Sequence, residues 1–369
     1  MKFSVEKNVL LNALNTVLKA VPSKSPISSL EGILFETGDQ TLKLTGYDLK
    51  KAIYTKIDAD IAESGYCCLN ARFFSEMIRR LEDGFVTVSC DANNSVRVKC
   101  GKSEYKFIAL DSNEFPEIPI FDETKKIEIP QDILKSMIDK TIFAVSKEEV
   151  RPVYTGSLFE IERNILNVVA IDGYRLARRT EKIENTHLED CTFIVPGNAL
   201  SDIEKICEES EENAVISIGE KHISFTIGRT VVITRRLEGE FINHKNSVPQ
   251  TFRYEITVDR MEFISSIERV ALVQSEKNSS SIRMTFNDSY IDLVCSTPIG
   301  KAEDTCTSEG NGEELEIGFN DRYILETLKA AEGEKIKICI NTSSSPCVIK
   351  AIDGSDSYTY MILPVRLRA

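Results

Sequence analysis

The chain has 369 residues, which is more than one hydrophobic core normally supports, so its length predicts two or three domains. Its composition, 42% hydrophobic and 28% charged, is that of a globular protein, and no run approaches the roughly 20 apolar residues of a membrane span. Lys and Arg number 45 against 58 Asp and Glu, which gives a formal net charge of −13. This acidic balance argues against tight, charge-driven binding to nucleic acid, but not against a locally basic surface.

The cysteines and the start of the chain indicate the compartment. The ten cysteines show neither CxxC nor Cys/His metal spacing, and the first residues, MKFSVEKN, contain no apolar signal core. Without a secretion signal, such cysteines are typical of reduced thiols in a core. We therefore expect a cytoplasmic protein with no metal or other cofactor and no membrane contact.

The first sign of internal organisation is a short alternating strand that runs directly into an amphipathic helix. This pattern occurs three times, in residues 3–14, 127–138 and 256–267. From Phe3 to Ile127 is 124 residues, and from Ile127 to Ile256 is 129. A recurrence at this spacing predicts a repeated structural unit of roughly 120 residues.

Two further markers keep the same period. A strand end followed by a helix is expected at Asn70, Pro196 and Asn320, which are 126 and 124 residues apart. A turn glycine between two alternating strands is expected at Gly101, Gly228 and Gly354, which are 127 and 126 residues apart. Glycine is favoured there because a tight hairpin turn requires positive φ.

Together the markers predict an α+β chain with three tandem copies of one unit, each holding two helices and several hairpin-connected strands. Charged stretches at residues 121–126 and 245–251 separate the copies. The expected domains are residues 1–121, 126–246 and 252–369. In the last hairpin of the third copy, Pro364 should take the apolar C-terminal segment off the sheet, because proline cannot donate to a strand ladder.

Three motifs, read with this period, resemble a known family. They are MKFSVE at residues 1–6, AIDGYRLA at 170–177 and LPVRL at 363–367. They resemble the bacterial DNA polymerase III beta subunit, the sliding clamp, and the resemblance covers essentially the whole chain. It implies a head-to-tail homodimer that closes as a six-domain ring around duplex DNA, with helices inside and sheets outside. The implied function is non-catalytic: the ring tethers the replicative polymerase and confers processivity.

The resemblance also implies partners and a pocket for them. In that family the polymerase III alpha subunit, the clamp loader, other polymerases and repair factors dock a Gln-containing peptide ending in Leu or Phe between the second and third domains. The implied pocket residues here are Tyr154, Ile171, Gly173, Arg175, Leu176, Ile242, Met361, Leu363, Pro364, Val365 and Arg366. The family usually has Thr, Pro and Met where this chain has Ile171, Ile242 and Val365. Simple core packing is the competing interpretation of Ile171 and Leu176.

Basic side chains on the repeated helices are candidates for facing DNA. They are Arg72, Arg79, Arg80, Lys135 and Lys140, and the resemblance adds Lys24 and Arg151 as family DNA-contact positions. A ring holds DNA by topology and needs only weak, sliding contacts, so these charges are compatible with the acidic balance. The competing interpretation is an ordinary solvated helix face.

At the seam between two copies, the resemblance implies an apolar centre with a charged rim. The residues implied there are Arg72, Tyr105 and Phe107 of one copy, and Leu272, Val273, Glu303 and Asp304 of the other. Tyr105 and Phe107 could equally belong to the core of the first domain.

Two other functions compete with a clamp. An enzyme is disfavoured because His187, His222 and His244 are scattered, and because no Walker-type or GxGxxG motif occurs. A monomeric repeat protein that binds peptides without encircling DNA would keep the pocket but have no seam.

Overall fold

The computed structural model describes residues 1–119, 125–183, 189–274, 281–353 and 357–367. Its contacts define two compact units: Met1–Leu134 with Asp202–Arg236, and Lys135–Ser201 with Leu237–Ala369. The turn glycine predicted at Gly354, His187 and most of the predicted boundary at 121–126 lie outside the described residues. Among the described residues, no helix is long and apolar enough to cross a membrane.

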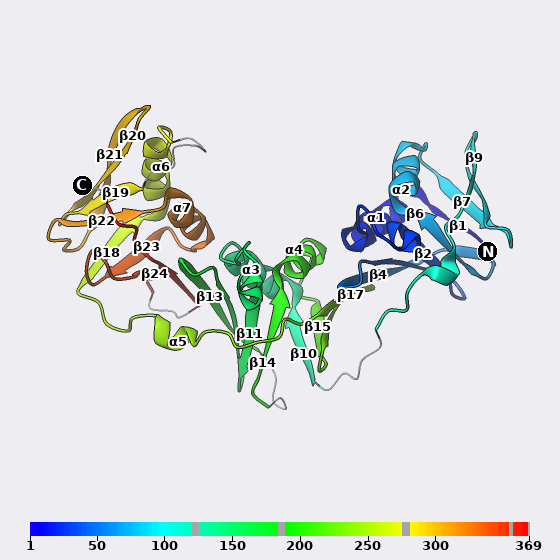
Figure 1. Cartoon of the computed structure of the whole chain (residues 1–369), viewed down its shortest axis with the longest axis horizontal. Coiled ribbons are helices and arrows are strands. Elements are labelled where there is room, and N and C mark those ends of the chain that lie inside the picture. Colours follow the sequence, from blue (N-terminus) through cyan, green and yellow to red (C-terminus); the bar gives the residue numbers. More distant parts are fainter. Residues whose placement is uncertain (120–124, 184–188, 275–280, 354–356, 368–369) are drawn as a thin grey trace. The chain divides into compact units, whose positions relative to one another are not determined.

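The first repeat contains two α-helices and nine strands (Figure 1). The helices are α1 (Lys7–Val17) and α2 (Ala71–Arg80). The strands are β1 (Lys2–Glu6), β2 (Gly32–Thr37), β3 (Thr41–Tyr47), β4 (Lys51–Asp58), β5 (Asp60–Glu63), β6 (Tyr66–Asn70), β7 (Phe85–Cys90), β8 (Ser95–Cys100) and β9 (Ser103–Ile108).

The second repeat follows the same order without a counterpart of β5 among its described residues, and it has one short additional helix. Its helices are α3 (Gln131–Ile142), α4 (Gly197–Ile206) and the additional α5 (His244–Ser247). Its strands are β10 (Lys125–Pro130), β11 (Gly156–Glu162), β12 (Ile165–Ile171), β13 (Arg175–Lys182), β14 (Cys191–Pro196), β15 (Asn213–Ile218), β16 (His222–Ile227) and β17 (Thr230–Arg235).

The third repeat again follows this order. Its helices are α6 (Arg260–Ala271) and α7 (Asp321–Ala330). Its strands are β18 (Tyr254–Asp259), β19 (Ile282–Phe286), β20 (Tyr290–Thr297), β21 (Gly300–Glu309), β22 (Leu315–Phe319), β23 (Lys335–Ile340), β24 (Cys347–Ala351) and β25 (Tyr358–Ile362). The predicted α+β architecture of three tandem repeats is therefore confirmed.

Asparagine explains why the second helix of the first and third repeats begins where it does. The side-chain oxygen of Asn70 accepts a hydrogen bond from the backbone N–H of Phe73, and that of Asn320 accepts one from Tyr323. Each asparagine thereby satisfies a donor that the first turn of a helix leaves without a partner. The same residues that marked the period in the sequence therefore fix the helix starts.

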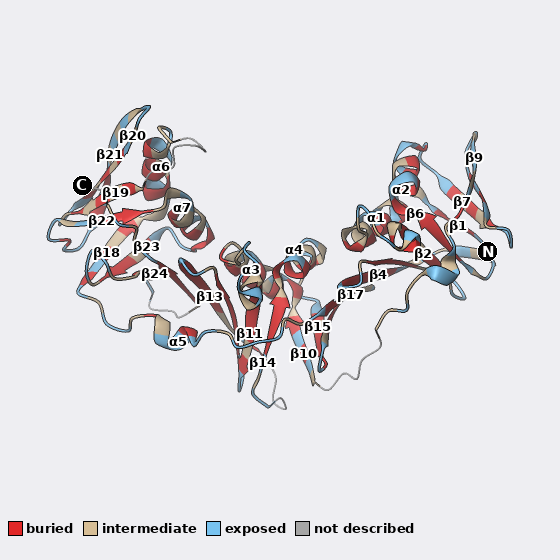
Figure 2. Ribbon diagram, viewed as in Figure 1, coloured by how far each residue is buried: buried red, intermediate tan, exposed pale blue. Residues whose placement is uncertain are grey.

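The buried aromatic residues of the first repeat show how helices and sheets share a core. Phe3 of β1, Phe35 of β2 and Phe74 of α2 are fully buried, with ring centroids 6.1 and 5.4 Å apart in succession. Burial of each side chain stabilises the fold by roughly 2–3 kcal/mol. Figure 2 shows buried residues concentrated in the strands and on one side of the helices.

Sheets continue from one repeat into the next. In the first unit, β17 of the second repeat pairs with β4 of the first, and the resulting sheet has the order β10-β15-β16-β17-β4-β3-β2-β6. In the second unit, β25 of the third repeat pairs with β13 of the second inside a twelve-stranded sheet. Each junction therefore pairs the last strand of one repeat with the equivalent strand, β4 or β13, of the repeat before it.

Candidate partner site and ring seam

The floor of the candidate partner site is an apolar cluster on three adjacent strands. Ile171 of β12, Leu176 of β13 and Met361 of β25 are all buried, and the ladders pair Leu176 with both of the others. Tyr154 and Phe241 pack against this cluster, and their ring centroids lie 5.5 Å apart. The side chains of Ile171, Leu176 and Met361 are thus part of the core. An apolar ligand bound here would contact the outer edge of this cluster.

The described part of the C-terminal segment, residues 363–367, leaves β25 after Ile362 and is held by two backbone hydrogen bonds. The N–H of Leu363 donates to the carbonyl of Tyr174 over 2.8 Å, and that of Val365 donates to the carbonyl of Gly318 over 2.9 Å. A Cβ on Gly318 would lie only 2.8 Å from the Val365 carbonyl oxygen, so this close approach requires glycine. β25 ends at Ile362, two residues before Pro364, and Val365 then forms an isolated bridge to Gly318 of β22.

The turn between β12 and β13 is fixed by an aspartate. The Asp172 Oδ1 atom accepts hydrogen bonds from the backbone N–H groups of Tyr174 and Arg175, over 2.9 and 3.0 Å. Gly173 has a φ of +93°, which favours glycine, and a Cβ there would meet no atom within 4 Å. Tyr174 is 60% exposed and Ile242 is 40% exposed. These two large apolar side chains are therefore available to solvent.

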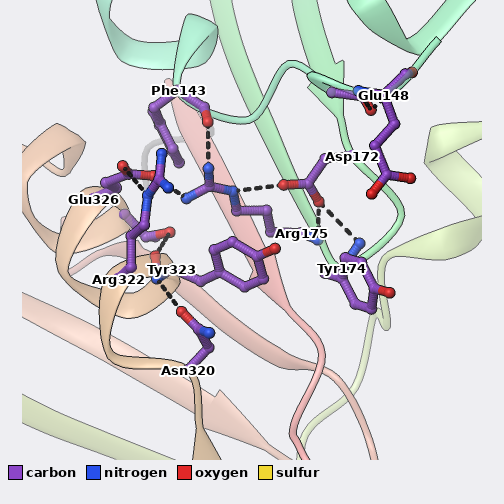
Figure 3. Close-up of polar contacts among 11 residues, drawn as sticks. Phe143, Glu148, Asp172, Tyr174, Arg175, Asn320, Arg322, Tyr323 and Glu326 are labelled. Carbon is purple, nitrogen blue, oxygen red and sulfur yellow. Dashed lines mark hydrogen bonds and ion pairs between the residues drawn. The ribbon is translucent and has the colours of Figure 1, made fainter. Parts of the chain in front are cut away.

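Arg175, whose polar contacts are drawn in Figure 3, is the most deeply buried charged residue of the predicted pocket, with its side chain 4% exposed. Its Nε donates to Asp172 over 3.0 Å, its Nη1 to Glu326 of α7 over 2.5 Å, and its Nη2 to the carbonyl of Phe143. The guanidinium also lies 5.1 and 4.5 Å from the ring centroids of Phe143 and Tyr323. These interactions direct the guanidinium toward α7, so its structural role is to join the second repeat to the third.

The stability of this contact should depend on pH. Burial alone would raise the pKa of the Glu326 carboxyl, but hydrogen bonds from Arg322 and Arg175 lower that pKa below its ordinary value. Such a carboxyl stabilises the fold at pH values above the pKa that it has in the unfolded chain. This stabilisation disappears as the pH falls through the lower pKa that it has in the folded chain. We expect Glu326→Gln to lower the urea midpoint near neutral pH, and the difference from wild type to shrink in acid. A difference that does not change with pH, measured by circular dichroism, would contradict this assignment.

The predicted seam residues are partly exposed in the single chain. Leu272 is 82% exposed and Tyr105 is 39% exposed, whereas Phe107 packs edge-on against Phe73 of α2 at 5.1 Å. Val273 packs against the core of the third repeat. Leu272 and Tyr105 are therefore the two of these four that present the most surface to another molecule.

The acidic residues predicted at the seam already have partners in their own chain. Asp304 accepts a hydrogen bond from Arg269, which lowers the pKa of the Asp304 carboxyl, and Glu303 forms an ion pair with Lys301. The predicted partner Arg72 is exposed on the first turn of α2. Any pairing of Arg72 with these acids across a seam would therefore be added to existing ion pairs.

Three of the candidate DNA-facing residues carry charges that acidic neighbours offset. Arg79 and Arg80 both pair with Glu76, over 3.0 and 3.1 Å, and Lys140 pairs with Asp139 over 3.3 Å. The remaining candidates are Lys24 and Arg151, which are exposed, Arg72, and Lys135, which is half-buried. Arg151 also lies 5.7 Å from the centroid of the Tyr154 ring. Such locally neutralised cations suit weak rather than tight phosphate contacts.

Sequence reasoning missed two exposed apolar residues near the seam positions. Ile299, before β21, is 67% exposed, and Phe73 of α2 is 49% exposed. The signal was present in the repeat, because Phe73 follows Asn70 as Tyr323 follows Asn320. Tyr323 stacks on Tyr174 at 6.0 Å inside the chain, so the matching position in α2 is suited to a similar contact.

Three tandem α+β repeats that share continuous sheets define the class of three-domain clamp proteins. Comparison with known families agrees along the chain. The N-terminal, central and C-terminal domains of the DNA polymerase III beta subunit match residues 1–119, 128–243 and 245–366. The chain therefore belongs to the DNA polymerase III beta subunit family, and its function is that of a DNA sliding clamp.

Individual relatives support the same conclusion. The beta sliding clamp of Bacillus subtilis (strain 168) is 31% identical, over 99% of this chain and 100% of the relative, and that of Staphylococcus aureus is 30% identical over 99% of each chain. The crystal structure of the Bacillus subtilis DNA polymerase sliding clamp matches with a TM-score of 0.95, at 31% identity over 100% of both chains. A Pseudomonas aeruginosa sliding clamp bound to griselimycin matches with a TM-score of 0.94, at 26% identity over 100% of both chains. The resemblance inferred from the sequence is confirmed, and proteins of this family are non-catalytic processivity factors.

Proposed function

We propose that two copies of this chain close head to tail into a cytoplasmic ring of six repeats around duplex DNA. The ring would carry the polymerase III alpha subunit, the clamp loader and other polymerases and repair factors on its partner sites. The observation that carries this proposal is the register of the two junctions inside the chain. It supports a third junction, between copies, that uses the same two strand edges.

The two internal junctions are equivalent residue by residue. Thr230 of β17 pairs with Thr55 of β4, and Tyr358 of β25 pairs with Arg179 of β13. Thr55 and Arg179 are 124 residues apart and Thr230 and Tyr358 are 128 apart, both within the range of 124 to 129 that the repeat markers show. The hairpins before β17 and β9 also match, because Ile227 pairs with Thr230 as Cys100 pairs with Ser103.

The matching edges of the first and third repeats remain open in the single chain. In the described part of the chain, β9 is the last strand of its sheet, and β21 contacts β18 only through Ser308 and Glu309. The hairpin register puts Asp304 of β21 at the position of Arg179, and Ser103 of β9 at the position of Tyr358. Ser103 of one copy would therefore lie opposite Asp304 of the other, and Tyr105 opposite Ala302. Because a head-to-tail interface closes into a ring when the rotation permits, this third pairing would complete the six-repeat assembly.

The packing at the second internal junction supports the predicted apolar seam. Phe143, which follows α3, packs edge-on against Tyr360 of β25, with ring centroids 5.7 Å apart. Leu272 stands 129 residues after Phe143 and directly follows α6, as Phe143 directly follows α3. Tyr105 is the third residue of β9, as Tyr360 is the third residue of β25. Leu272 against Tyr105 would therefore be the equivalent contact at the seam, with both side chains already exposed.

A topological assay tests the ring. A clamp loaded on nicked circular DNA should stay bound at high salt. Salt weakens phosphate contacts, but a closed ring can leave the DNA only over a DNA end. Cutting the circle should release it within the time taken to slide off. Retention would be followed by gel filtration of labelled clamp with DNA, using the same plasmid before and after linearisation. Equal retention on linear DNA would contradict encirclement and favour the monomeric peptide-binding alternative.

The apolar cluster and the tail support a peptide as the partner element. Ile171, Leu176 and Met361 form an apolar floor, and Leu363 and Ile242 are exposed large side chains. A peptide ending in Leu or Phe would bury its anchor against such a floor, where a few contacts carry most of the binding energy. The chain would thus hold partners on one surface while the ring holds DNA.

A further inference from the structure

The two junctions inside the chain each contain an ion pair at the same place. At the first junction, Lys51 begins β4, is 5% exposed, and donates to Asp202 of α4. At the second, Arg175 begins β13, is 4% exposed, and donates to Glu326 of α7 (Figure 3). Each cation begins the strand that receives the next repeat, and each acid lies on the second helix of that next repeat.

The positions match in sequence as well as in space. From Lys51 to Arg175 is 124 residues, and from Asp202 to Glu326 is also 124. Both cations follow the same turn: Asp48 Oδ1 accepts from the Lys51 N–H over 2.6 Å, as Asp172 Oδ1 accepts from the Arg175 N–H over 3.0 Å. The ion pair is therefore a feature of the repeat rather than of one junction.

The third copy of these positions keeps the acid but has no cation. Thr297 takes the place of the turn aspartate, and its Oγ1 accepts from the Ile299 N–H over 3.3 Å. Gly300 then begins β21, 125 residues after Arg175. The acid is Glu76 of α2, which follows Asn70 at the same distance as Glu326 follows Asn320. At a seam between copies, Gly300 would stand where Lys51 and Arg175 stand inside the chain.

We propose that the seam is the third junction of the repeat built without its ion pair, and that the missing cation sets how fast the two copies separate. The proposal rests on the head-to-tail dimer proposed above. The apolar contact of the second junction has a counterpart, since Ile299 and Phe73 occupy the places of the stacked Tyr174 and Tyr323. The seam therefore has apolar contacts and strand pairing, but not the cation that ties each internal junction to the helix of the next repeat.

The acid at the seam is free to accept such a cation. In the single chain the side chain of Glu76 is 47% exposed and pairs only with arginines of its own helix, Arg79 and Arg80, among the ion pairs of the described residues. Exposed pairs of this kind contribute little. Glu326 also accepts from an arginine of its own helix, Arg322 over 2.9 Å, and still binds Arg175. Pairing within the helix therefore does not prevent the junction pair.

A missing cation can be restored without straining the backbone. Gly300 does not have the positive φ that disfavours other residues, and a Cβ added to it would meet no atom within 4 Å. Gly300→Arg would reproduce Arg175, and Gly300→Lys would reproduce Lys51. Gly300→Glu is the matched control of opposite charge at the same position.

Subunit exchange between two isotopically labelled pools, followed by native mass spectrometry, tests the proposal. We expect Gly300→Arg to slow exchange about tenfold or more, because a desolvated charge pair acts mainly on dissociation. Gly300→Lys should act in the same direction, and Gly300→Glu should speed exchange because it faces Glu76. Adding Glu76→Gln to Gly300→Arg should return exchange to near the wild-type rate.

The outcomes separate this inference from the proposed function. A wild-type chain that remains monomeric at every concentration would refute the ring dimer and the inference with it. A wild-type dimer in which neither Gly300→Arg nor Gly300→Lys slows exchange would overturn the inference alone. Slowing that persists after Glu76→Gln would also overturn it, because the added cation would then have another partner.

Discussion

Replacing Arg175 by leucine should lower the free energy of unfolding by about 3–5 kcal/mol, because it leaves the Asp172 carboxylate without its cation and Glu326 with only the exposed Arg322. Asp172 and Glu326 have side chains only 12% and 32% exposed, and both accept hydrogen bonds from this one guanidinium. The substitution also removes the group that lies between the rings of Phe143 and Tyr323. The second and third repeats would keep the Arg179–Glu332 ion pair but lose the polar connection made by Arg175.

Urea unfolding followed by circular dichroism measures this effect. The transition to follow is that of the unit containing β13 and β25, because a chain of several domains need not unfold in one step. Arg322→Leu is the matched control, since Arg322 donates to the same Glu326 but its side chain is 58% exposed. We expect the control to cost less than about 1 kcal/mol. Equal losses for the two variants would show that Arg175 has no special role.

The repeat architecture could be predicted because three independent markers kept one period. Asn70 and Asn320 were visible as helix starts, and the structure shows both side chains capping the helices they precede. The choice of partner strand could not be predicted in this way. Nothing in the sequence of β17 distinguishes β4 from other strand edges, because a ladder is formed by backbone groups that all residues except proline share.

The direction of individual side chains was the second limit. Arg175 was predicted for the partner pocket on the strength of its motif, and the structure shows its guanidinium directed to Glu326, 151 residues later in the chain. A motif fixes where a residue stands on a strand, but only the tertiary fold brings its partner into reach. Ile171 and Leu176 illustrate the same limit, since both are buried and belong to the core beneath the site.

The missing ion pair at Gly300 became visible only when the two kinds of information were combined. The sequence alone gives an unremarkable glycine at a strand start. The structure alone gives two buried ion pairs, with Lys51 and Arg175 as their cations. The period of the repeat connects them and assigns the third position to Gly300. Internal repeats therefore allow one part of a chain to serve as the reference for another.

Removing residues 363–369 should strongly weaken binding of a partner peptide of the Gln-x-x-Leu-Phe type while leaving the dimer intact. The cut falls after Ile362 because Met361 and Ile362 are buried and pair with both β13 and β24. Beyond that point, the described tail is attached by two backbone hydrogen bonds, from Leu363 and Val365. Its loss should therefore cost about 1–2 kcal/mol of stability, whereas peptide affinity should fall by about 100-fold.

Fluorescence anisotropy of a labelled peptide, with native mass spectrometry of the same samples, measures both quantities. Leu363→Ser tests the tail by a single change, and we expect about 2 kcal/mol of lost binding, or roughly 30-fold in affinity. Ile352→Ser is the matched control, because Ile352 is a 43% exposed aliphatic residue of the same repeat and lies outside the predicted pocket. Affinity that is unchanged in the truncated chain would remove the tail from the partner site. If Leu363→Ser and Ile352→Ser weaken binding equally, the loss comes from the stability of the third repeat rather than from contact with the peptide.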